Sequence, residues 1–431
     1  MKPVLQIALD FVNLSRALKI ADLAVKGGAD WIEAGTPLIK SEGLDAVRAL
    51  RGKFPKKIII ADMKTMDAGR IEVESAAKAG ADVVCVLAAA SESTIKEAVR
   101  AGKNYGVKVE ADLIGIGENE LCKTAGKMER IGVDYLGVHC PIDDQMKGEG
   151  SFLRLSKVSK TVNIPIAAAG GINKETVLKA VKAGADIVVV GGAITKDKKP
   201  QQAAKDIKDS ITKGKVFKTR LFKRAGLSDV YKILRMVSSA NLSDAMHRSG
   251  DLKGLRPLFP GIKMAGEVLT VRTYPGDWAK TVEAVDLAVK GQVIVIDACS
   301  AGPAVWGELA THSALKKKLA GVIIDGAVRD TAEIKRLKFP VFSKLVMPTA
   351  GEPKGFGEIG APVTVGGVKI FSGDWVLGDD DGVVRIPKEI LIETANRAMG
   401  VLEQENRLRE EIESGSTLSK VIDLPRWEKK G

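Results

Sequence analysis

Cysteine, histidine and aromatic residues are scarce in this sequence of 431 residues. There are three histidines, aromatic residues make up 4%, and the four cysteines (Cys85, Cys122, Cys140 and Cys299) form no CxxC pair. This pattern excludes a dense disulfide framework and is typical of reduced thiols in a cytosolic protein. It also argues against a protein that binds nucleic acid by stacking bases on aromatic side chains.

Long apolar runs are absent as well. A run such as Val83–Ala90 is far shorter than the roughly 20 residues of a membrane-spanning helix. The apolar stretch Val4–Leu9 stops at Asp10, which is too short for a signal peptide. Apolar residues nevertheless make up 45% of the chain, so it can bury real cores and is not disordered over most of its length. We expect a cytoplasmic globular protein of two or three domains.

Acidic residues are outnumbered by basic ones, and the formal net charge is +12. Half of this excess lies in residues 213–224, where six of twelve residues are basic and none is acidic. We interpret residues 212–228 as a basic linker, in which the spacing of Val216, Phe217, Leu221 and Phe222 allows a helix. A nucleic-acid contact of this linker is the alternative, but the remaining charge is spread over the chain and gives that partner little support.

A short pattern recurs every 52 residues in the first half of the chain. Each copy joins a glycine suited to a helix C-terminus to an aspartate that precedes an apolar run; these aspartates are Asp30, Asp82, Asp134 and Asp186. Further apolar runs lie between the copies, and such short runs are typical of parallel strands buried on both faces. The expected strands lie near residues 4–10, 31–35, 57–64, 82–88, 108–115, 135–140, 165–171 and 186–194.

Eight alternating strand and helix units in about 210 residues indicate a TIM (β/α)8 barrel, which we assign to residues 1–211. The 52-residue period then corresponds to two βα units, a quarter of the barrel. An open, doubly wound sheet is the alternative.

Charged side chains stand where the predicted strands end, which is the active-site face of a TIM barrel. They are Asp10, Glu33, Asp62, Lys64, Asp67, Glu110, Asp112 and His139. Several desolvated carboxylates around one lysine repel one another, and a divalent cation such as Mg²⁺ removes that conflict. His139 can move a proton near neutral pH, and it is expected on the side of the barrel opposite the lysine. Cys140 beside it is expected to take no part.

Two glycine pairs, Gly170-Gly171 and Gly191-Gly192, follow the seventh and eighth predicted strands. In this fold a phosphate group is frequently bound there by backbone amides, to which glycine allows close approach. The pairs therefore predict a phosphorylated substrate, with tight packing at the turns as the alternative.

These residues resemble the orotidine-monophosphate decarboxylase superfamily. The resemblance covers residues 1–211 and rests on Ala8-Leu-Asp10, Glu33-Ala-Gly-Thr-Pro, Asp62-Met-Lys64-Thr-Met-Asp67 and the glycine pairs. Within the superfamily, the chain is most similar to the 3-hexulose-6-phosphate synthases. Asp112, Ile142 and Ala169 stand where the sister branch, the 3-keto-gulonate-6-phosphate decarboxylases, has Glu, Arg and Thr.

The resemblance implies a reversible aldol condensation of formaldehyde with D-ribulose 5-phosphate through a 1,2-enediolate. It places Mg²⁺ on Glu33 and Asp62, proton transfer on His139, and Lys64 beside the enediolate oxygens, held by Asp10 and Asp67. Asp112 completes the catalytic set. Asp67 is supplied across a dimer interface in this superfamily, which implies a homodimer. The decarboxylase of the sister branch remains the alternative activity.

The second half, which we assign to residues 229–431, restarts with a helical stretch from Ser228. We expect strands near 265–272, 292–297, 320–325 and 340–344, then a β-rich section over 361–386 and a helical tail after Pro387. The pattern indicates an α/β domain with a mixed sheet and excludes a second eightfold barrel.

A predicted strand of this half delivers Arg329 and Asp330 together to a loop. Arginine suits a carboxylate or phosphate and aspartate suits a hard cation, whereas a structural ion pair is the alternative. Two segments, Trp306-Gly-Glu-Leu-Ala310 and Arg329-Asp330-Thr-Ala-Glu333, resemble the RraA-like family. That family includes regulators of ribonuclease activity and 4-hydroxy-4-methyl-2-oxoglutarate aldolases.

In aldolases of that family, the resemblance implies, Arg329 grips a substrate carboxylate and Asp330 anchors Mg²⁺, partly through waters. Backbone amides of Gly307, Glu308 and Leu309 would bind a pyruvyl group. Twenty-one residues separate Gly307 from Arg329, where the family has twenty, so the substrate stays open.

The leading interpretation is a bifunctional enzyme whose second domain is a metal-dependent aldolase or decarboxylase of 2-oxo acids. Glu333 favours catalysis, because it completes the set of residues near the metal, and a surface that only binds a partner does not need such a set. The alternative is a non-catalytic regulator with a ribonuclease partner. RraA-like proteins typically form trimers, so dimeric barrels and trimeric second domains imply a homo-oligomer.

Overall fold

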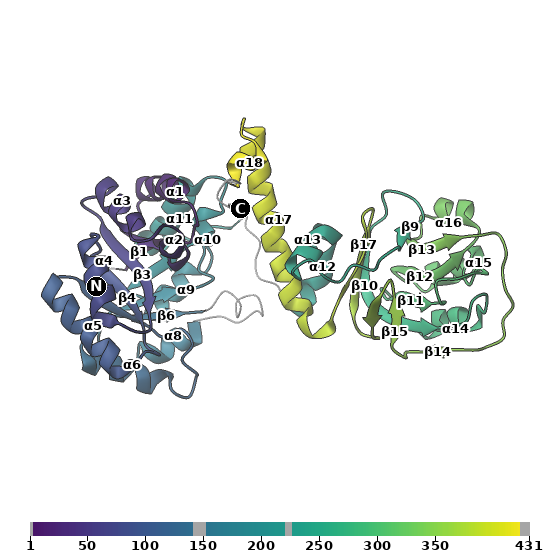
Figure 1. Ribbon diagram of the computed structural model, residues 1–431, viewed down its shortest axis with the longest axis horizontal. Helices are drawn as coiled ribbons and strands as arrows, with labels where there is room; N and C mark the ends of the chain where they lie inside the picture. The colour runs from purple at the N-terminus through teal and green to yellow at the C-terminus, as the bar shows by residue number, and fades with distance from the viewer. Residues whose placement is uncertain (1–2, 141–151, 220–225, 423–431) are drawn as a thin grey trace, which may run out of the picture. The chain divides into compact units, whose positions relative to one another are not determined.

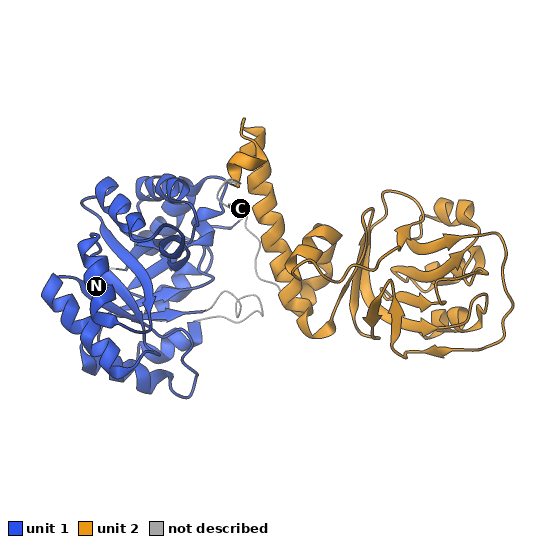
Figure 2. Ribbon diagram, viewed as in Figure 1, with its two compact units in different colours: residues 1–145, 149–223 blue, residues 146–148, 224–431 orange. Residues whose placement is uncertain are grey.

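The computed structural model describes residues 3–140, 152–219 and 226–422 (Figure 1). These residues form two compact units, the first ending at residue 219 and the second beginning at residue 226 (Figure 2). The expected fold class, a TIM barrel followed by an α/β domain with a mixed sheet, is confirmed. In the described part of the chain, none of the helices has the length and apolar character needed to cross a membrane.

Eight parallel strands of the first unit close into a barrel in sequence order, so the open sheet is excluded. Their interior-facing positions alternate with residues packed against the helices. The strands are β1 (Val4–Leu9), β2 (Trp31–Ala34), β3 (Ile58–Thr65), β4 (Val83–Leu87), β5 (Lys108–Asp112), β6 (Tyr135–His139), β7 (Ile166–Ala169) and β8 (Ile187–Val190).

Amphipathic helices cover the outside of this barrel. Helix α5, for example, begins after Ser91, whose side chain accepts a hydrogen bond from the Thr94 amide, and ends at Gly106, which has a left-handed backbone. The helices are α1 (Leu14–Lys26), α2 (Thr36–Glu42), α3 (Asp45–Lys53), α4 (Gly69–Lys78), α5 (Glu92–Tyr105), α6 (Leu121–Ile131), α8 (Phe152–Val158), α9 (Val177–Lys182), α10 (Gly192–Thr195) and α11 (Pro200–Lys213).

The 52-residue pattern has a structural reason. Each repeated aspartate accepts a hydrogen bond from a backbone amide in the odd-numbered strand beside it, and the distances are 2.7 Å for Asp30 to Leu5 and 2.7 Å for Asp82 to Ile59. Asp134 and Asp186 bind β5 and β7 in the same way, at 3.0 Å each. The repeated glycines, Gly28, Gly80, Gly132 and Gly184, all have positive φ. The pattern therefore marks the turns that feed the even-numbered strands.

The second unit is built on one mixed sheet of order β18-β17-β10-β11-β12-β13-β9, with β14 paired to β10. Strands β10 to β13 are parallel, and the outer strands are antiparallel to their neighbours. An isolated bridge between Asp251 and Val384 nearly closes the sheet. The strands of this sheet are β9 (Arg256–Pro257), β10 (Met264–Arg272), β11 (Val293–Asp297), β12 (Gly321–Val328), β13 (Val341–Val346), β14 (Glu358–Ile359), β17 (Trp375–Asp379) and β18 (Gly382–Ile386). Strands β15 (Val363–Val365) and β16 (Val368–Ile370) form a separate antiparallel pair.

Helices α14, α15 and α16 pack on one face of this sheet through Val285, Ala314, Ile334 and neighbouring apolar residues. This places the beginning of α15 and the beginning of α16 at the same end of the domain. The helices are η1 (Leu227–Asp229), α12 (Val230–Met236), α13 (Ser239–Ala245), α14 (Ala279–Leu287), α15 (Glu308–Lys316), α16 (Thr331–Leu337), η2 (Lys388–Ile390), α17 (Leu391–Glu413) and α18 (Leu418–Val421).

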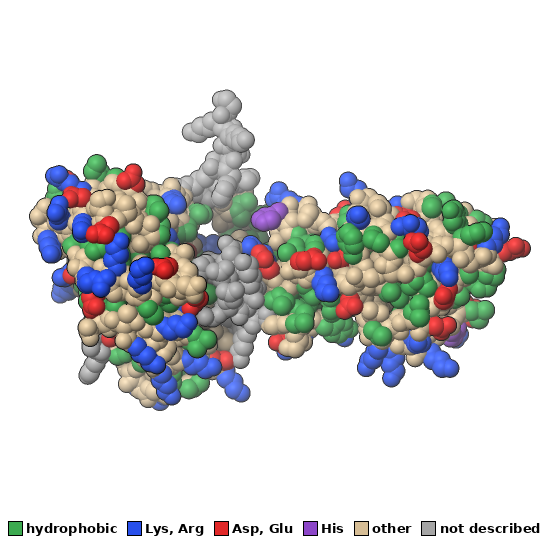
Figure 3. Space-filling model, turned by 90° about the horizontal axis from the view of Figure 1, so that it is seen from below, with side chains coloured by type: hydrophobic (Ala, Val, Ile, Leu, Met, Phe, Trp, Pro, Cys, Tyr) green, Lys and Arg blue, Asp and Glu red, His purple; other side chains and the backbone are tan. Residues whose placement is uncertain are grey.

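The basic segment, where the spacing of apolar residues allows a helix, is not helical after Gly214 in the residues that the structure describes there. Residues 214–219 form neither helix nor strand, and Val216 is 70% exposed. Gly214 ends α11 with a left-handed backbone, which stops the helix before the basic run. Leu221 and Phe222 lie outside the described residues. On the face shown in Figure 3, basic and acidic side chains are interspersed over both units.

Candidate functional site

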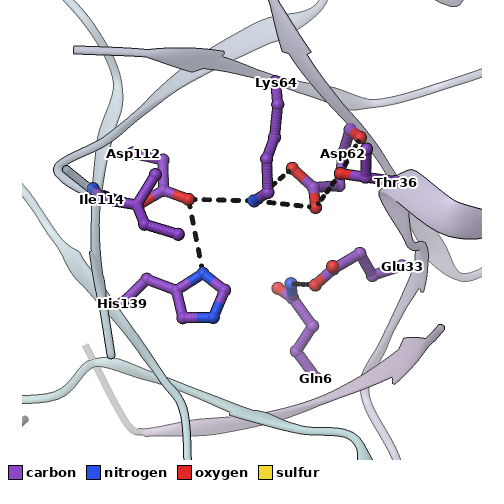
Figure 4. A network of polar contacts seen from close by, with 8 residues as sticks. All are labelled: Gln6, Glu33, Thr36, Asp62, Lys64, Asp112, Ile114 and His139. Carbon is purple, nitrogen blue, oxygen red and sulfur yellow. Dashed lines mark hydrogen bonds and ion pairs between the residues drawn. The ribbon is translucent and has the colours of Figure 1, made fainter. Parts of the chain in front are cut away.

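The charged strand ends of the barrel converge on one network of polar contacts (Figure 4). Lys64 Nζ lies 3.0 Å from Asp62 Oδ2 and 3.1 Å from Asp112 Oδ2. Asp112 Oδ2 in turn lies 3.5 Å from His139 Nδ1. The contacts join β3, β5 and β6 across the barrel mouth, so four of the predicted residues form one line of polar contacts.

A local irregularity of β3 aims Lys64 into the mouth. The register between β3 and β4 shifts between Ala61 and Thr65, and Lys64 has a positive φ of 47°. Such a backbone is strained for a residue with a side chain and is frequent at functional sites. Although burial alone lowers the pKa of Lys64, Asp62 and Asp112 raise it above its ordinary value. Lys64 is therefore a fixed positive charge at neutral pH.

The predicted partnership of Asp10 with Lys64 is not a direct ion pair in the described residues, although the charge of Lys64 acts to lower the pKa of Asp10. Within the described residues, the ion pairs of Lys64 go to Asp62 and Asp112. Asp10 instead packs where Gly35 and Gly191 leave room, and a Cβ on Gly35 would overlap its Oδ1 atom. Desolvation and the charge of Asp62 raise the pKa of Asp10.

Asp67 likewise makes no ion pair with Lys64 among the described residues. It is exposed, and its Oδ1 accepts a hydrogen bond from the Ala68 amide at 2.7 Å. Its predicted role belongs to a neighbouring subunit and stays a prediction.

Asp112 links the lysine on β3 to the histidine on β6 across the barrel mouth. Its Oδ1 accepts a hydrogen bond from the Ile114 amide at 2.9 Å, which fixes the carboxylate. Burial acts to raise the pKa of Asp112, but His139 and Lys64 hold it below its ordinary value. Asp112 is therefore an ionised partner that orients the His139 ring through Nδ1.

The carboxylates of Glu33 and Asp62 at the barrel mouth have the donor chemistry that a divalent cation requires. Glu33 and Asp62 are buried, and burial together with the charge of Asp62 raises the pKa of Glu33 well above its ordinary value. Gln6 donates to Glu33 Oε2 at 2.5 Å, and Thr36 donates to Asp62 Oδ2 at 2.7 Å, which orients both carboxylates. Glu33 and Asp62 would hold the ion, whose charge would relieve their repulsion.

Gln6 and Thr36 are not among the site residues identified from the sequence, where Glu110 has no role of its own. Gln6 and Thr36 orient the carboxylates, and Glu110 lies beneath Asp112 in the barrel. Gln6 could have been found from the sequence, because it is a polar residue inside an apolar strand. It lies two positions before Ala8 and four before Asp10, so it shares a strand face with them. Thr36 belongs to the motif Glu33-Ala-Gly-Thr-Pro, but nothing in the sequence pattern indicated that its side chain orients a carboxylate.

Glu110 is a buried carboxyl whose Oε2 has no hydrogen-bond partner within the described part of the chain. Gly137 makes room for it, since a Cβ there would lie 2.7 Å from Glu110 Oε1. Burial, with Asp112 and Asp62 nearby, raises the pKa of Glu110 to about 8. The side chain is therefore largely neutral at pH 7.

Replacing Glu110 by Gln is expected to remove part of the pH dependence of stability. A carboxyl whose pKa is about 8 when folded and near its ordinary value of 4.5 when unfolded stabilises the fold fully below pH 4.5. That contribution falls as the pH rises to about 8, by about 1.4 kcal/mol per pH unit at most. Urea unfolding of the barrel at pH 5.5 and 8.5 should show a smaller difference for Glu110→Gln than for the unchanged chain. The control Glu97→Gln, on the barrel surface with its side chain 44% exposed, should keep the full difference. Equal differences in all three proteins would contradict the assignment.

The predicted phosphate glycines lie at the same mouth. Gly170 and Gly171 follow β7 with φ of 98° and 70°, and a Cβ on Gly170 would overlap Cys140. Gly191 precedes α10, which begins at Gly192. Tight packing thus accounts for Gly170, whereas Gly192 is open enough for backbone approach. Cys140 is buried against this turn.

In the second unit the predicted residues also gather. Asp330 Oδ2 accepts a hydrogen bond from the Glu308 amide at 3.1 Å and lies 3.4 Å from Arg329 Nε. Gly307 is required there, because a Cβ would meet Asp330. Asp330 has a positive φ of 58° at the start of α16, and Leu309 is 79% exposed. One oxygen of Asp330 is thus engaged by the protein itself.

Glu308 and Glu333 come together with a residue that sequence reasoning missed, His312. One ligand atom from each of the three lies within 4.8 Å of the others. His312 stands four residues after Glu308 on α15, and this spacing was the available signal.

Comparisons with known proteins agree with the division of the chain into two units. A family model described as Orotidine 5'-phosphate decarboxylase / HUMPS family matches residues 3–207, and one described as Aldolase/RraA matches residues 239–385. The 3-hexulose-6-phosphate synthase of Mycobacterium gastri is 39% identical over 207 residues, which are 48% of this chain and 99% of that protein. The synthase of Bacillus subtilis (strain 168) is 38% identical over 211 residues, 49% of this chain and 99% of that protein.

A crystal structure of a 3-hexulose-6-phosphate synthase is 39% identical, with a TM-score of 0.47, and the match covers 48% of this chain and all of that one. The relatives thus match the barrel over nearly their full length. The chain therefore belongs to the orotidine 5'-phosphate decarboxylase / HUMPS family through its first unit, and its second unit is an RraA-like domain.

Proposed function

We propose that the barrel is a lyase that condenses formaldehyde with D-ribulose 5-phosphate to 3-hexulose 6-phosphate in a reversible, Mg²⁺-dependent reaction. Relatives named 3-hexulose-6-phosphate synthase that are 38–39% identical support this assignment. The observation that carries it is the chain of contacts from Asp62 through Lys64 and Asp112 to His139.

In this proposal each residue has a defined part. A divalent cation held by Glu33 and Asp62 supplies Lewis-acid stabilisation to oxygens of the sugar. His139, oriented by Asp112, removes the C1 proton of ribulose 5-phosphate, and the fixed charge of Lys64 stabilises the enediolate. The enediolate carbon then attacks formaldehyde, one carbon–carbon bond forms, and the new alkoxide takes up a proton. Backbone amides beside Gly171 and Gly192 bind the phosphate.

One assay separates this activity from that of the sister branch. The full chain with Mg²⁺ is offered formaldehyde with ribulose 5-phosphate and, separately, 3-keto-L-gulonate 6-phosphate. We expect formaldehyde to be consumed in the first reaction and little carbon dioxide to be released in the second. Carbon dioxide release without formaldehyde consumption would assign the barrel to the decarboxylases.

For the second unit we propose a metal-dependent cleavage or decarboxylation of a 2-oxo acid. Its support is the contact of Asp330 with Arg329 and with the Glu308 amide, which sets a cationic side chain beside carboxylates at one end of the domain.

Arg329→Ala is expected to lower kcat/KM for 2-oxo acid cleavage about 100-fold, because the guanidinium would bind the substrate carboxylate. The exposed control Arg272→Ala should have no effect. If the full chain cleaves no 2-oxo acid and instead binds a ribonuclease, the regulatory alternative is supported.

We propose that the chain forms a homo-oligomer through both units. Asp67 is exposed and makes no ion pair with Lys64 among the described residues of its own chain, which supports a role toward a second copy. Light scattering on the purified chain should give a mass well above the 45.8 kDa of one copy. A mass equal to one copy would contradict the proposal.

A further inference from the structure

The beginnings of helices α15 and α16 bring three metal-ligating side chains together. Glu308 and His312 are one helical turn apart on α15, so they share a face. Glu333 lies in the first turn of α16, and one ligand atom of each residue lies within 4.8 Å of the other two. We propose that Glu308, His312 and Glu333 bind a divalent transition-metal ion of the zinc and cobalt class.

The spacing of the ligand atoms suits such an ion. Two ligand atoms that each lie about 2.0–2.2 Å from a zinc ion are about 3–4 Å apart. His312 Nε2 lies 3.8 Å from Glu308 Oε1, which is too long for a hydrogen bond but fits two ligands of one ion. All three side chains reach solvent to some degree, with His312 exposed, so an ion can enter.

The chemistry of the three donors selects the class of metal. Mg²⁺ is bound mainly by oxygen ligands and keeps several waters, whereas an imidazole nitrogen favours zinc, cobalt and similar ions. One nitrogen with two carboxylates is the kind of set that leaves a coordination position open for water or a substrate. His312 thus distinguishes this site from an all-oxygen magnesium site.

Neighbouring residues hold two of the ligands in place. Arg336 binds both oxygens of Glu333, with its Nε 2.8 Å from Oε2. A carboxylate has enough lone pairs to serve a guanidinium and a metal together. The Glu308 amide is bound by Asp330 Oδ2 at 3.1 Å, which fixes the start of α15. Such partners of metal ligands orient them for binding.

The site deepens the function proposed for the second unit, because it lies beside Arg329 and Asp330, but its test is independent of turnover. The full chain carrying Asp62→Ala, which removes the proposed barrel site, is freed of metal with EDTA and titrated with Zn²⁺ by calorimetry. Co²⁺ is then added, and its visible absorption reports the coordination. We expect one Zn²⁺ per chain, and absorption typical of Co²⁺ with a nitrogen ligand.

His312→Gln is expected to weaken Zn²⁺ binding at least tenfold and to change the Co²⁺ spectrum. The matched control His247→Gln removes another exposed histidine of the same unit and should bind as before. Equal binding by both variants, or equal affinity for Mg²⁺ and Zn²⁺, would overturn the proposal. Zn²⁺ binding that depends on His312 supports the site even if no 2-oxo acid is cleaved, and in that case only the proposed activity fails.

Discussion

Replacing Asp62 by Ala is expected to reduce formaldehyde condensation by about three orders of magnitude or more, since the proposed metal and the lysine both depend on it. Asp62 is one of the two proposed metal ligands, and its carboxylate also lies 3.0 Å from Lys64 Nζ. Its removal leaves Glu33 without a neighbouring ligand and Lys64 with Asp112 as its remaining ion pair in the described chain.

The measurement is formaldehyde consumption under saturating Mg²⁺, together with the affinity of the protein for Mn²⁺. Circular dichroism verifies that the variant is folded. The control Asp45→Ala removes an aspartate whose side chain is 77% exposed on α3, and it should retain full activity. Full turnover by Asp62→Ala would refute the proposed role of this residue.

His139→Asn is expected to lower kcat by a factor of about 10² to 10⁴, the range typical of a lost general acid or base. The effect should fall on kcat, with little change in KM, because the phosphate and the metal are bound by other residues. Asp112 keeps its contacts to Lys64 and to the Ile114 amide, so the variant should fold.

The check is a steady-state comparison over pH, with His247→Asn as the control. The limb of the profile that reports the base should disappear in His139→Asn and persist in the control. A kcat within twofold of the unchanged chain would show that another group moves the proton.

The barrel could be predicted from the sequence because its repeated residues meet requirements of local backbone structure. The glycines and aspartates of the 52-residue pattern each satisfy a requirement within one turn, namely a positive φ and a strand amide that needs an acceptor. Asp62, Lys64, Asp112 and His139 could be predicted together for a related reason, because all lie in the carboxyl-terminal halves of parallel strands, near the barrel mouth.

Pairings within the site could not be predicted in the same way. Which carboxylate meets Lys64 depends on the irregularity between Ala61 and Thr65, a detail that strand patterns do not encode. Gln6 meets Glu33 because of the register of β1 and β2. His312 meets Glu333 only through the packing of α15 on α16. These contacts join residues far apart in sequence, so they follow from tertiary packing.

The central claim is that the barrel forms a carbon–carbon bond between formaldehyde and ribulose 5-phosphate. The most direct test is to give the full chain ¹³C-formaldehyde, ribulose 5-phosphate and Mg²⁺, and to follow the label by NMR. The account predicts that the label moves into a hexulose 6-phosphate as one formaldehyde and one ribulose 5-phosphate disappear together. A label that stays in formaldehyde while the folded protein binds both Mg²⁺ and ribulose 5-phosphate would contradict it.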